Sequence, residues 1–180
     1  MNKNILIYGV PGVGKTYITR SLSTKTNTPL IELDTLRKPL QKGRNISDFP
    51  FLFYGTTEAY KFFGDLNREN VKRGLLSVRD TMNLPVVEVL TNLNEASIIE
   101  GAFIDPQNVA SYGKILLLVQ ENETIHRKQF FKHREYSKDI EQSFIAARYL
   151  QEDLISEAVD LKIPKFSSKE FEEILRYTQS

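Results

Sequence analysis

Gly9-Val10-Pro11-Gly12-Val13-Gly14-Lys15-Thr16 is the stretch of the sequence that decides the fold. Its first and last glycines are separated by four residues and are followed by Lys-Thr, which is the pattern of a phosphate-binding loop. Glycines let the main chain turn tightly and approach phosphate oxygens closely. The N–H groups that open the following helix attract anions. We therefore expect this stretch to bind the phosphates of a nucleoside triphosphate, between a strand and a helix.

Two side chains of this loop carry the expected phosphate chemistry. Lys15 supplies a positive charge to the β- and γ-phosphates, and the Thr16 hydroxyl is a hard oxygen ligand for Mg²⁺. An ordinary glycine turn with an exposed lysine is the alternative. The expected nucleotide-binding residues are Gly12, Val13, Gly14, Lys15, Thr16 and Tyr17, and Thr16 is also the expected metal ligand.

Short apolar runs and helical patterns alternate along the chain. The apolar runs predict strands at residues 4–8, 29–33, 97–100, 114–119 and 162–166. Helices are expected at 15–23, over most of 56–94 with a break or kink at Pro85, at 140–158, and after a capping box made by Ser167 and Glu170. Residues 41–53 are predicted to form a loop. The alternation implies a parallel sheet covered by helices on both faces, in one domain spanning residues 1–180.

The composition excludes several kinds of protein. The sequence has 180 residues and a net charge of +1, so no strong field favours nucleic acid or an anionic membrane. It contains no cysteine, which excludes disulfides, thiolate metal sites and cysteine nucleophiles. No apolar stretch approaches the roughly 20 residues that span a bilayer. We expect a soluble, cytoplasmic monomer or homodimer that binds neither nucleic acid nor membrane.

Two carboxylates follow predicted strands. Asp34 ends the second strand and Glu100 ends the third, and the carboxyl ends of parallel strands form the ligand crevice. Asp34 is expected to orient or deprotonate an acceptor hydroxyl, or to hold a Mg²⁺-bound water. Glu100 is expected to hold another such water or a substrate hydroxyl. A helix N-cap is the alternative for Asp34, and a solvated strand end for Glu100.

Four arginines are candidates for binding anionic groups. Arg37 lies one helical turn after Asp34 and could grip an anionic acceptor, and Arg79 is a second candidate for that role. Arg127 and Arg134 lie in the most basic segment of the chain, which is predicted to form a lid over residues 122–138. Their role there would be to neutralise charge in the transition state. The alternative in each case is a solvated surface arginine.

The motifs found elsewhere in the sequence indicate which class of P-loop protein this is. The sequence has no Asn-Lys-x-Asp stretch, which disfavours a GTPase, and no strand ends in Asp-Glu, which disfavours a mechanical ATPase of the hexameric type. A small kinase fits best. Two other hypotheses stay open: a nucleotide-dependent switch that contacts a partner through aromatic residues between 41 and 63, and a kinase of nucleotides or nucleic-acid ends.

The order of motifs resembles the nucleoside-monophosphate-kinase-like group of kinases, and within it 2-phosphoglycerate kinase most closely. The resemblance rests on four stretches: Gly-Val-Pro-Gly-Val-Gly-Lys-Thr at 9–16, Leu-Asp-Thr-Leu-Arg at 33–37, Ser-Ile-Ile-Glu-Gly-Ala-Phe-Ile-Asp-Pro at 97–106 and His-Arg-Lys-Gln-Phe-Phe-Lys-His-Arg at 126–134. It implies a three-layer P-loop NTPase fold with a five-stranded parallel sheet of order 2-3-1-4-5 and a helical lid. It also implies ATP as phosphate donor and a phosphorylated hydroxy acid as acceptor.

The resemblance assigns roles to matching positions. Lys15 and Thr16 serve ATP and Mg²⁺, while Asp34, Arg37 and Glu100 face the acceptor and the lid arginines complete the site. This family favours histidine where Phe103 stands, so the acceptor is left open. We expect a kinase that phosphorylates an alcohol group of a small anionic metabolite such as 2-phosphoglycerate. Its catalytic residues would be Lys15, Asp34, Arg127 and Arg134.

Overall fold

The computed structural model describes residues 4–180 and has a five-stranded parallel sheet at its centre. The strand order is β2-β3-β1-β4-β5, which confirms the predicted order and the P-loop NTPase fold. The strands are β1 (Asn4–Tyr8), β2 (Leu30–Glu32), β3 (Ile98–Gly101), β4 (Gly113–Val119) and β5 (Lys165–Ser167). The central strands are buried on both faces, which is why their sequences are continuous apolar runs.

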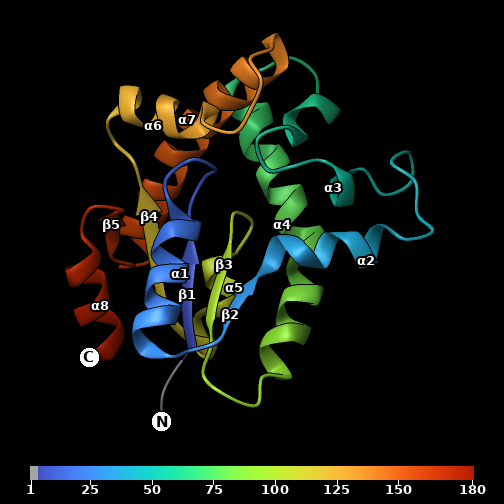
Figure 1. Cartoon of the computed structure of the whole chain (residues 1–180). Helices are drawn as coiled ribbons and strands as arrows, with labels where there is room; N and C mark the ends of the chain where they lie inside the picture. The colour runs from blue at the N-terminus through green and yellow to red at the C-terminus, as the bar shows by residue number, and fades with distance from the viewer. Residues whose placement is uncertain (1–3) are drawn as a thin grey trace.

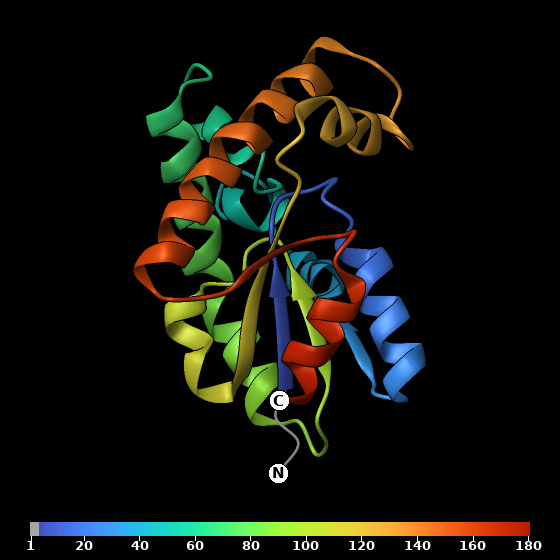
Figure 2. The same ribbon diagram turned by 90° about the vertical axis from the view of Figure 1, so that its left-hand side faces the viewer.

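Helices cover both faces of the sheet (Figures 1 and 2). One face carries α1 (Lys15–Thr26) and α8 (Phe171–Gln179), and the other carries α4 (Arg68–Thr91) and α7 (Lys138–Asp160). Shorter elements complete the fold: η1 (Leu33–Leu36), α2 (Arg37–Gln41), α3 (Pro50–Phe53), η2 (Ala59–Phe62), α5 (Pro106–Val109), η3 (Ala110–Tyr112) and α6 (Glu123–Phe131). No helix between residues 4 and 180 is both long and apolar enough to cross a membrane.

Helix α4 differs from its prediction in two ways. It starts at Arg68, where the Asn67 side chain accepts a hydrogen bond from the Asn70 N–H (2.9 Å), so much of 56–67 is not α-helical. It also runs without a break through Pro85. An interior proline costs a helix about 3 kcal/mol. The buried apolar face of α4 on either side of the proline offsets that cost, through Val71, Leu75, Val78, Met82, Val86 and Leu90.

Two further expectations need correction. The predicted loop 41–53 contains α3, which begins at Pro50, because proline suits the first turn of a helix. The capping box is only partly formed: the Ser167 N–H donates to Glu170 Oε2 (2.7 Å), but helix α8 starts after Glu170. Ser167 itself is the last residue of β5.

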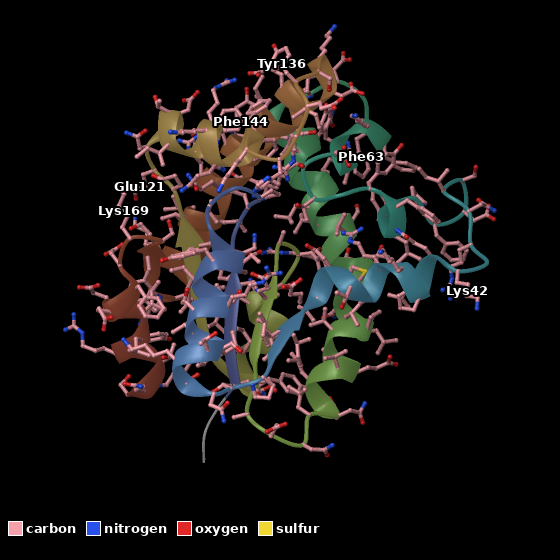
Figure 3. The ribbon with its side chains drawn as sticks, in the orientation of Figure 1. Lys42, Phe63, Glu121, Tyr136, Phe144 and Lys169 are labelled. Atoms are coloured by element: carbon pink, nitrogen blue, oxygen red, sulfur yellow. The ribbon has the colours of Figure 1, made fainter. Side chains whose placement is uncertain are left out.

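The phosphate loop joins β1 to α1 at the carboxyl edge of the sheet. Above that edge lie α3, α6 and the first turns of α7 (Figure 1). Phe63 and Phe144 belong to this upper layer (Figure 3). The fold therefore places the loop between the sheet and a helical layer, as expected for a site with a lid.

Candidate active site

The phosphate loop is enclosed by segments from distant parts of the chain. Gly12 and Gly14 have φ angles of 86° and 96°, which only glycine adopts without strain. A Cβ atom at Gly12 would lie 2.9 Å from Cα of Phe130 in α6, and one at Gly14 would lie 2.9 Å from Cβ of Ser168. These glycines therefore serve both the turn of the loop and the close packing around it.

Lys15 lies over the loop that precedes it. Its Nζ donates a hydrogen bond to the carbonyl oxygen of Val10 (3.1 Å). Burial lowers the pKa of Lys15, while the nearby carboxylates Glu100 and Asp34 oppose that shift. The ammonium group is thus held against the main chain of the loop.

Glu100 lies beneath the loop, on the donor side of the site. Its Oε1 accepts a hydrogen bond from the Thr16 hydroxyl (3.1 Å), and its Oε2 accepts one from the Thr19 hydroxyl (3.2 Å). Burial raises the pKa of Glu100, and Lys15 together with the two hydroxyl groups opposes the shift. Thr16 and Glu100 offer the hard oxygen atoms that Mg²⁺ prefers. No group of three or more His, Cys, Asp or Glu residues within 4–180 could hold a metal alone.

A cavity of about 220 Å³ opens beside the loop. It shares Pro11 with the loop, and its other walls come from four separate stretches of the chain. The lining residues are Pro11, Asp34, Arg37, Gly55, Thr56, Thr57, Glu58, Ala102, Phe103, Phe130, Arg134, Ile140 and Ser143. This acceptor cavity brings together Asp34, Arg37 and Arg134, which the sequence analysis selected.

Arg37 is fixed in the cavity wall by hydrogen bonds to the main chain and by a cation–π contact. Its Nη1 donates to the carbonyl oxygens of Leu52 (3.1 Å) and Tyr54 (2.8 Å), and its guanidinium lies 5.0 Å from the ring centre of Phe103. Burial lowers the pKa of Arg37, with Asp34 and Glu58 opposing. Its Nη2 is buried and has no hydrogen-bond partner among residues 4–180.

The two candidate lid arginines lie in different surroundings. Arg134 lines the acceptor cavity, with its guanidinium 4.2 Å from the ring centre of Phe130. Burial lowers its pKa, and Glu58 opposes the shift. Arg127 instead makes a two-pronged ion pair with Glu141 (2.7 Å for each bond) and lies outside the cavity lining. Arg127 would have to leave Glu141 to reach a phosphate.

Arg79 is not brought to the acceptor cavity. It is buried between α4 and α7, where its two terminal nitrogens donate to Glu157 (2.7 and 2.9 Å). Both residues line a different cavity of about 240 Å³. Its position in the middle of the long helix α4 accounts for this separation, because the acceptor cavity is built from segments above the sheet edge.

Several cavity residues escaped the sequence analysis. Thr57 and Glu58 lie in the turn before η2, and Ser143 lies in α7. Glu58 acts electrostatically on both Arg37 and Arg134. Neither motif nor spacing marks these residues, because only the folded chain brings them to the loop.

His126 connects α6 to the phosphate loop. Its side chain is fully buried, and its Nε2 donates to the carbonyl oxygen of Pro11 (2.9 Å), which assigns the proton to Nε2. Its Nδ1 then faces Arg148 Nη1 at 3.3 Å as an acceptor. Burial lowers the pKa of His126. His126 therefore holds the lid helix on the loop as a neutral imidazole.

A second cavity, of about 560 Å³, lies on the opposite flank of the loop. Its walls are the connections that follow β4 and β5, and the labelled side chains Glu121 and Lys169 mark them (Figure 3). Its volume falls within the range of about 300 to 1,000 Å³ that is usual for small-molecule sites. Tyr17, in the first turn of α1, is 68% exposed and contributes to neither cavity lining.

Comparison with solved structures shows where this fold occurs. The chain resembles shikimate kinase from Acinetobacter baumannii in complex with shikimate (TM-score 0.57, 13% identity, 97% of this chain and 89% of that one). It also resembles TT1252 from Thermus thermophilus (0.58, 16%, 99% and 97%). A third match is deoxyadenosine kinase from M. mycoides with bound dATP (0.53, 14%, 98% and 100%). These identities establish a shared fold alone.

Sequence comparison assigns the family. No curated protein matches the sequence. A model of the ATPase family associated with various cellular activities (AAA) matches residues 5–147, a range that starts in β1 and contains the phosphate loop, the acceptor-cavity residues up to Ser143 and the lid. The chain therefore belongs to the ATPase family associated with various cellular activities.

Proposed function

We propose that this protein is an ATP-dependent, Mg²⁺-assisted kinase that phosphorylates a hydroxyl group of a small anionic metabolite, with 2-phosphoglycerate as the first acceptor to test. The acceptor cavity carries the proposal, because it shares Pro11 with the phosphate loop and is lined by two carboxylates and two arginines. An enzyme that only hydrolyses ATP needs room for a water molecule there, not a cavity of about 220 Å³.

The donor half of the site holds ATP across the loop. The backbone N–H groups of the loop and Lys15 bind its β- and γ-phosphates, and the nucleoside occupies the larger cavity on the other flank. Thr16, with Glu100 behind it, would hold Mg²⁺, which when bound neutralises charge on the phosphate oxygens. The acceptor cavity then lies on the side of the loop away from the nucleoside.

The acceptor half supplies the nucleophile. Asp34 lines the cavity from η1, just after β2 rather than at the end of that strand, and it accepts the proton of the attacking hydroxyl. Arg37 and Arg134 bind the anionic group of the acceptor and balance the charge that develops on the transferred phosphoryl group. Glu58 keeps the empty cavity near electrical neutrality beside these two guanidinium groups.

The layer above the loop excludes water during transfer. Helix α6 is joined to the loop through His126 and Pro11, and Arg134 follows directly after that helix. Closing of this layer over ATP and acceptor would suppress wasteful hydrolysis. Because His126 is hydrogen-bonded to Pro11, a movement of α6 would also shift the phosphate loop.

A second function is favoured by one observation. Phe51, Phe62 and Phe63 form an aromatic cluster outside the acceptor-cavity lining, with ring centres 5.0 to 5.8 Å apart. Phe62 is 54% exposed and nearby Phe49 is 45% exposed. Exposed aromatic groups of this kind mark partner surfaces, so a nucleotide-dependent switch with slow ATP hydrolysis is the competing function.

An enzyme-coupled assay of ADP release, read by absorbance, separates the two functions. Purified protein with ATP and Mg²⁺ is given 2-phosphoglycerate, other hydroxy acids, nucleosides and nucleotides in turn. We expect one small anionic acceptor to raise turnover well above background hydrolysis. Background turnover with every acceptor would reject the kinase and leave the switch.

A further inference from the structure

A buried hydroxyl group without a partner lies in the acceptor-cavity wall. Ser143 is only 3% exposed, and its Oγ makes no hydrogen bond with the residues that the structure describes. Buried polar groups in folded proteins are nearly always hydrogen-bonded, so such an exception calls for an explanation. The cavity beside Ser143 offers one, because a bound molecule could supply the missing partner.

The position of Ser143 in α7 supports this explanation. Serine in a helix often bonds to the carbonyl oxygen one turn earlier, but Ser143 makes no such bond. Ile140 lies three residues earlier and also lines the cavity, so this face of α7 is directed toward it. The next residue, Phe144, packs instead among the lid aromatics at 5.2 Å from the His126 ring. Ser143 thus lies in the cavity wall, while its neighbour Phe144 packs among the aromatic rings of α6. Its Oγ is buried, so the hydroxyl must turn toward the cavity to meet a bound molecule.

A second unpartnered polar atom lies in the same cavity wall. Arg37 uses Nη1 to hold the main chain at Leu52 and Tyr54, while Nη2 is buried without a partner. Arg37 and Ser143 come from α2 and α7, which are more than a hundred residues apart in sequence. Among residues 4–180, the cavity wall therefore has one guanidinium nitrogen and one hydroxyl group without partners.

We propose that Ser143 and Nη2 of Arg37 form a polar subsite that selects the acceptor, with Ser143 binding a polar group other than the hydroxyl that is phosphorylated. The inference rests on the proposed kinase function. Both residues line the same cavity of about 220 Å³ beside the phosphate loop.

The test compares Ser143→Ala with Ser156→Ala, which removes an exposed hydroxyl from the same helix. We expect Ser143→Ala to raise the KM for 2-phosphoglycerate by about 3- to 10-fold, the value of one hydrogen bond, and to leave the KM for ATP unchanged. The melting temperature of the ligand-free variant should stay the same or rise, because an unpaired buried hydroxyl is removed. Ser156→Ala should change none of these quantities.

Each other outcome has a distinct meaning. A lower melting temperature of Ser143→Ala, with both KM values raised, would make Ser143 a structural residue. An unchanged KM for the acceptor would reject the subsite. Neither result would contradict the proposed kinase function. If nothing turns over, the kinase function fails. The subsite then stands only if 2-phosphoglycerate raises the melting temperature of the wild type but not of Ser143→Ala, and falls without that shift.

Discussion

The phosphate loop and the acceptor cavity lie side by side, yet the chain builds them in opposite ways. The loop is one run of eight residues, 9–16, whose geometry comes from its own glycines. The cavity takes side chains from residues 34–37, 55–58, 102–103 and 130–143, together with Pro11. The shape of the loop therefore depends on local backbone chemistry, whereas the shape of the cavity depends on how distant elements pack.

The two regions also differ in how fully their polar groups are paired. In the loop region, Lys15, Thr16 and Glu100 all have hydrogen-bond partners in the ligand-free protein. In the cavity, Arg37 and Ser143 each retain a buried polar atom without one. A loop that binds a common nucleotide can be complete in itself, while a selective cavity keeps groups that only its ligand satisfies.

The largest expected effect comes from a substitution in the phosphate loop. Lys15→Ala should lower turnover by about 10²–10³-fold, because a fixed positive charge on the transferred phosphate is lost. Circular dichroism should show an intact fold. Lys25→Ala is the matched control, since Lys25 lies on the same helix in an exposed ion pair with Glu172. Wild-type turnover in Lys15→Ala would remove the assignment of the loop.

On the cavity side, Asp34→Asn should lower kcat by about 10²-fold, because an amide cannot accept the proton of the acceptor hydroxyl. The KM for ATP should not change, since Asp34 lies on the acceptor flank of the loop. Asp80→Asn, an exposed change on α4, serves as the control. A rise in the KM for ATP with unchanged kcat would instead place Asp34 with the nucleotide.

The two candidate lid arginines allow a comparison within one segment, because Arg134 lines the cavity and Arg127 does not. Arg134→Ala should lower kcat by about tenfold or more, the value of one charge-assisted hydrogen bond, because Arg134 lines the cavity. Arg127→Ala should change kcat less than about threefold, since it loses mainly a partly exposed ion pair with Glu141. Steady-state kinetics of both variants with the same acceptor make the measurement. Equal losses would mean that Arg127 leaves Glu141 during turnover.

The smallest expected effect concerns His126, which joins α6 to the phosphate loop through Pro11. The pKa of His126 is lowered by burial, so below pH 6.5 the unfolded chain binds more protons than the native protein. The free energy of unfolding should therefore fall as pH drops below 6.5, by at most about 1.4 kcal/mol per pH unit for this group. Protonation of Nδ1 would also place a positive charge 3.3 Å from Nη1 of Arg148. Lys15 and Glu123 are the other charged neighbours of the ring.

His126→Gln tests this point, because glutamine can donate to the Pro11 carbonyl but does not titrate. Urea unfolding at pH 7.5 and 5.5 should show a smaller loss of stability in the variant than in the wild type. His133→Gln, at an exposed position, is the control. Equal pH dependence in all three proteins would mean that His126 is not the group responsible.

Much of the fold was predictable from the sequence because its signals are local. Apolar runs marked all five strands within a few residues, and the loop pattern marked the turn after β1. The errors came where packing outweighs local preference. Pro85 predicted a kink, but the buried faces around it hold α4 together. Residues 50–53 form a helical turn inside a stretch that had been predicted as a loop.

The candidate site divides in the same way. Asp34, Arg37 and Arg134 line one cavity, and Glu100 lies under the loop beside Thr16. Arg79 and Arg127 form ion pairs elsewhere, because Glu157 and Glu141 on α7 reach them in the folded chain. Sequence spacing identifies a basic residue but not the acidic partner that engages it.

The sequence by itself determined the triphosphate site, since glycines, a lysine and a threonine at set spacing contain all the chemistry that phosphate binding needs. It also predicted the parallel sheet, because short apolar runs alternate with helical patterns. Only the tertiary structure decided which arginines line the cavity, and that Ser143 and Glu58 join them. The physical reason is that a cavity wall is a property of several elements packed together, and no single segment contains it.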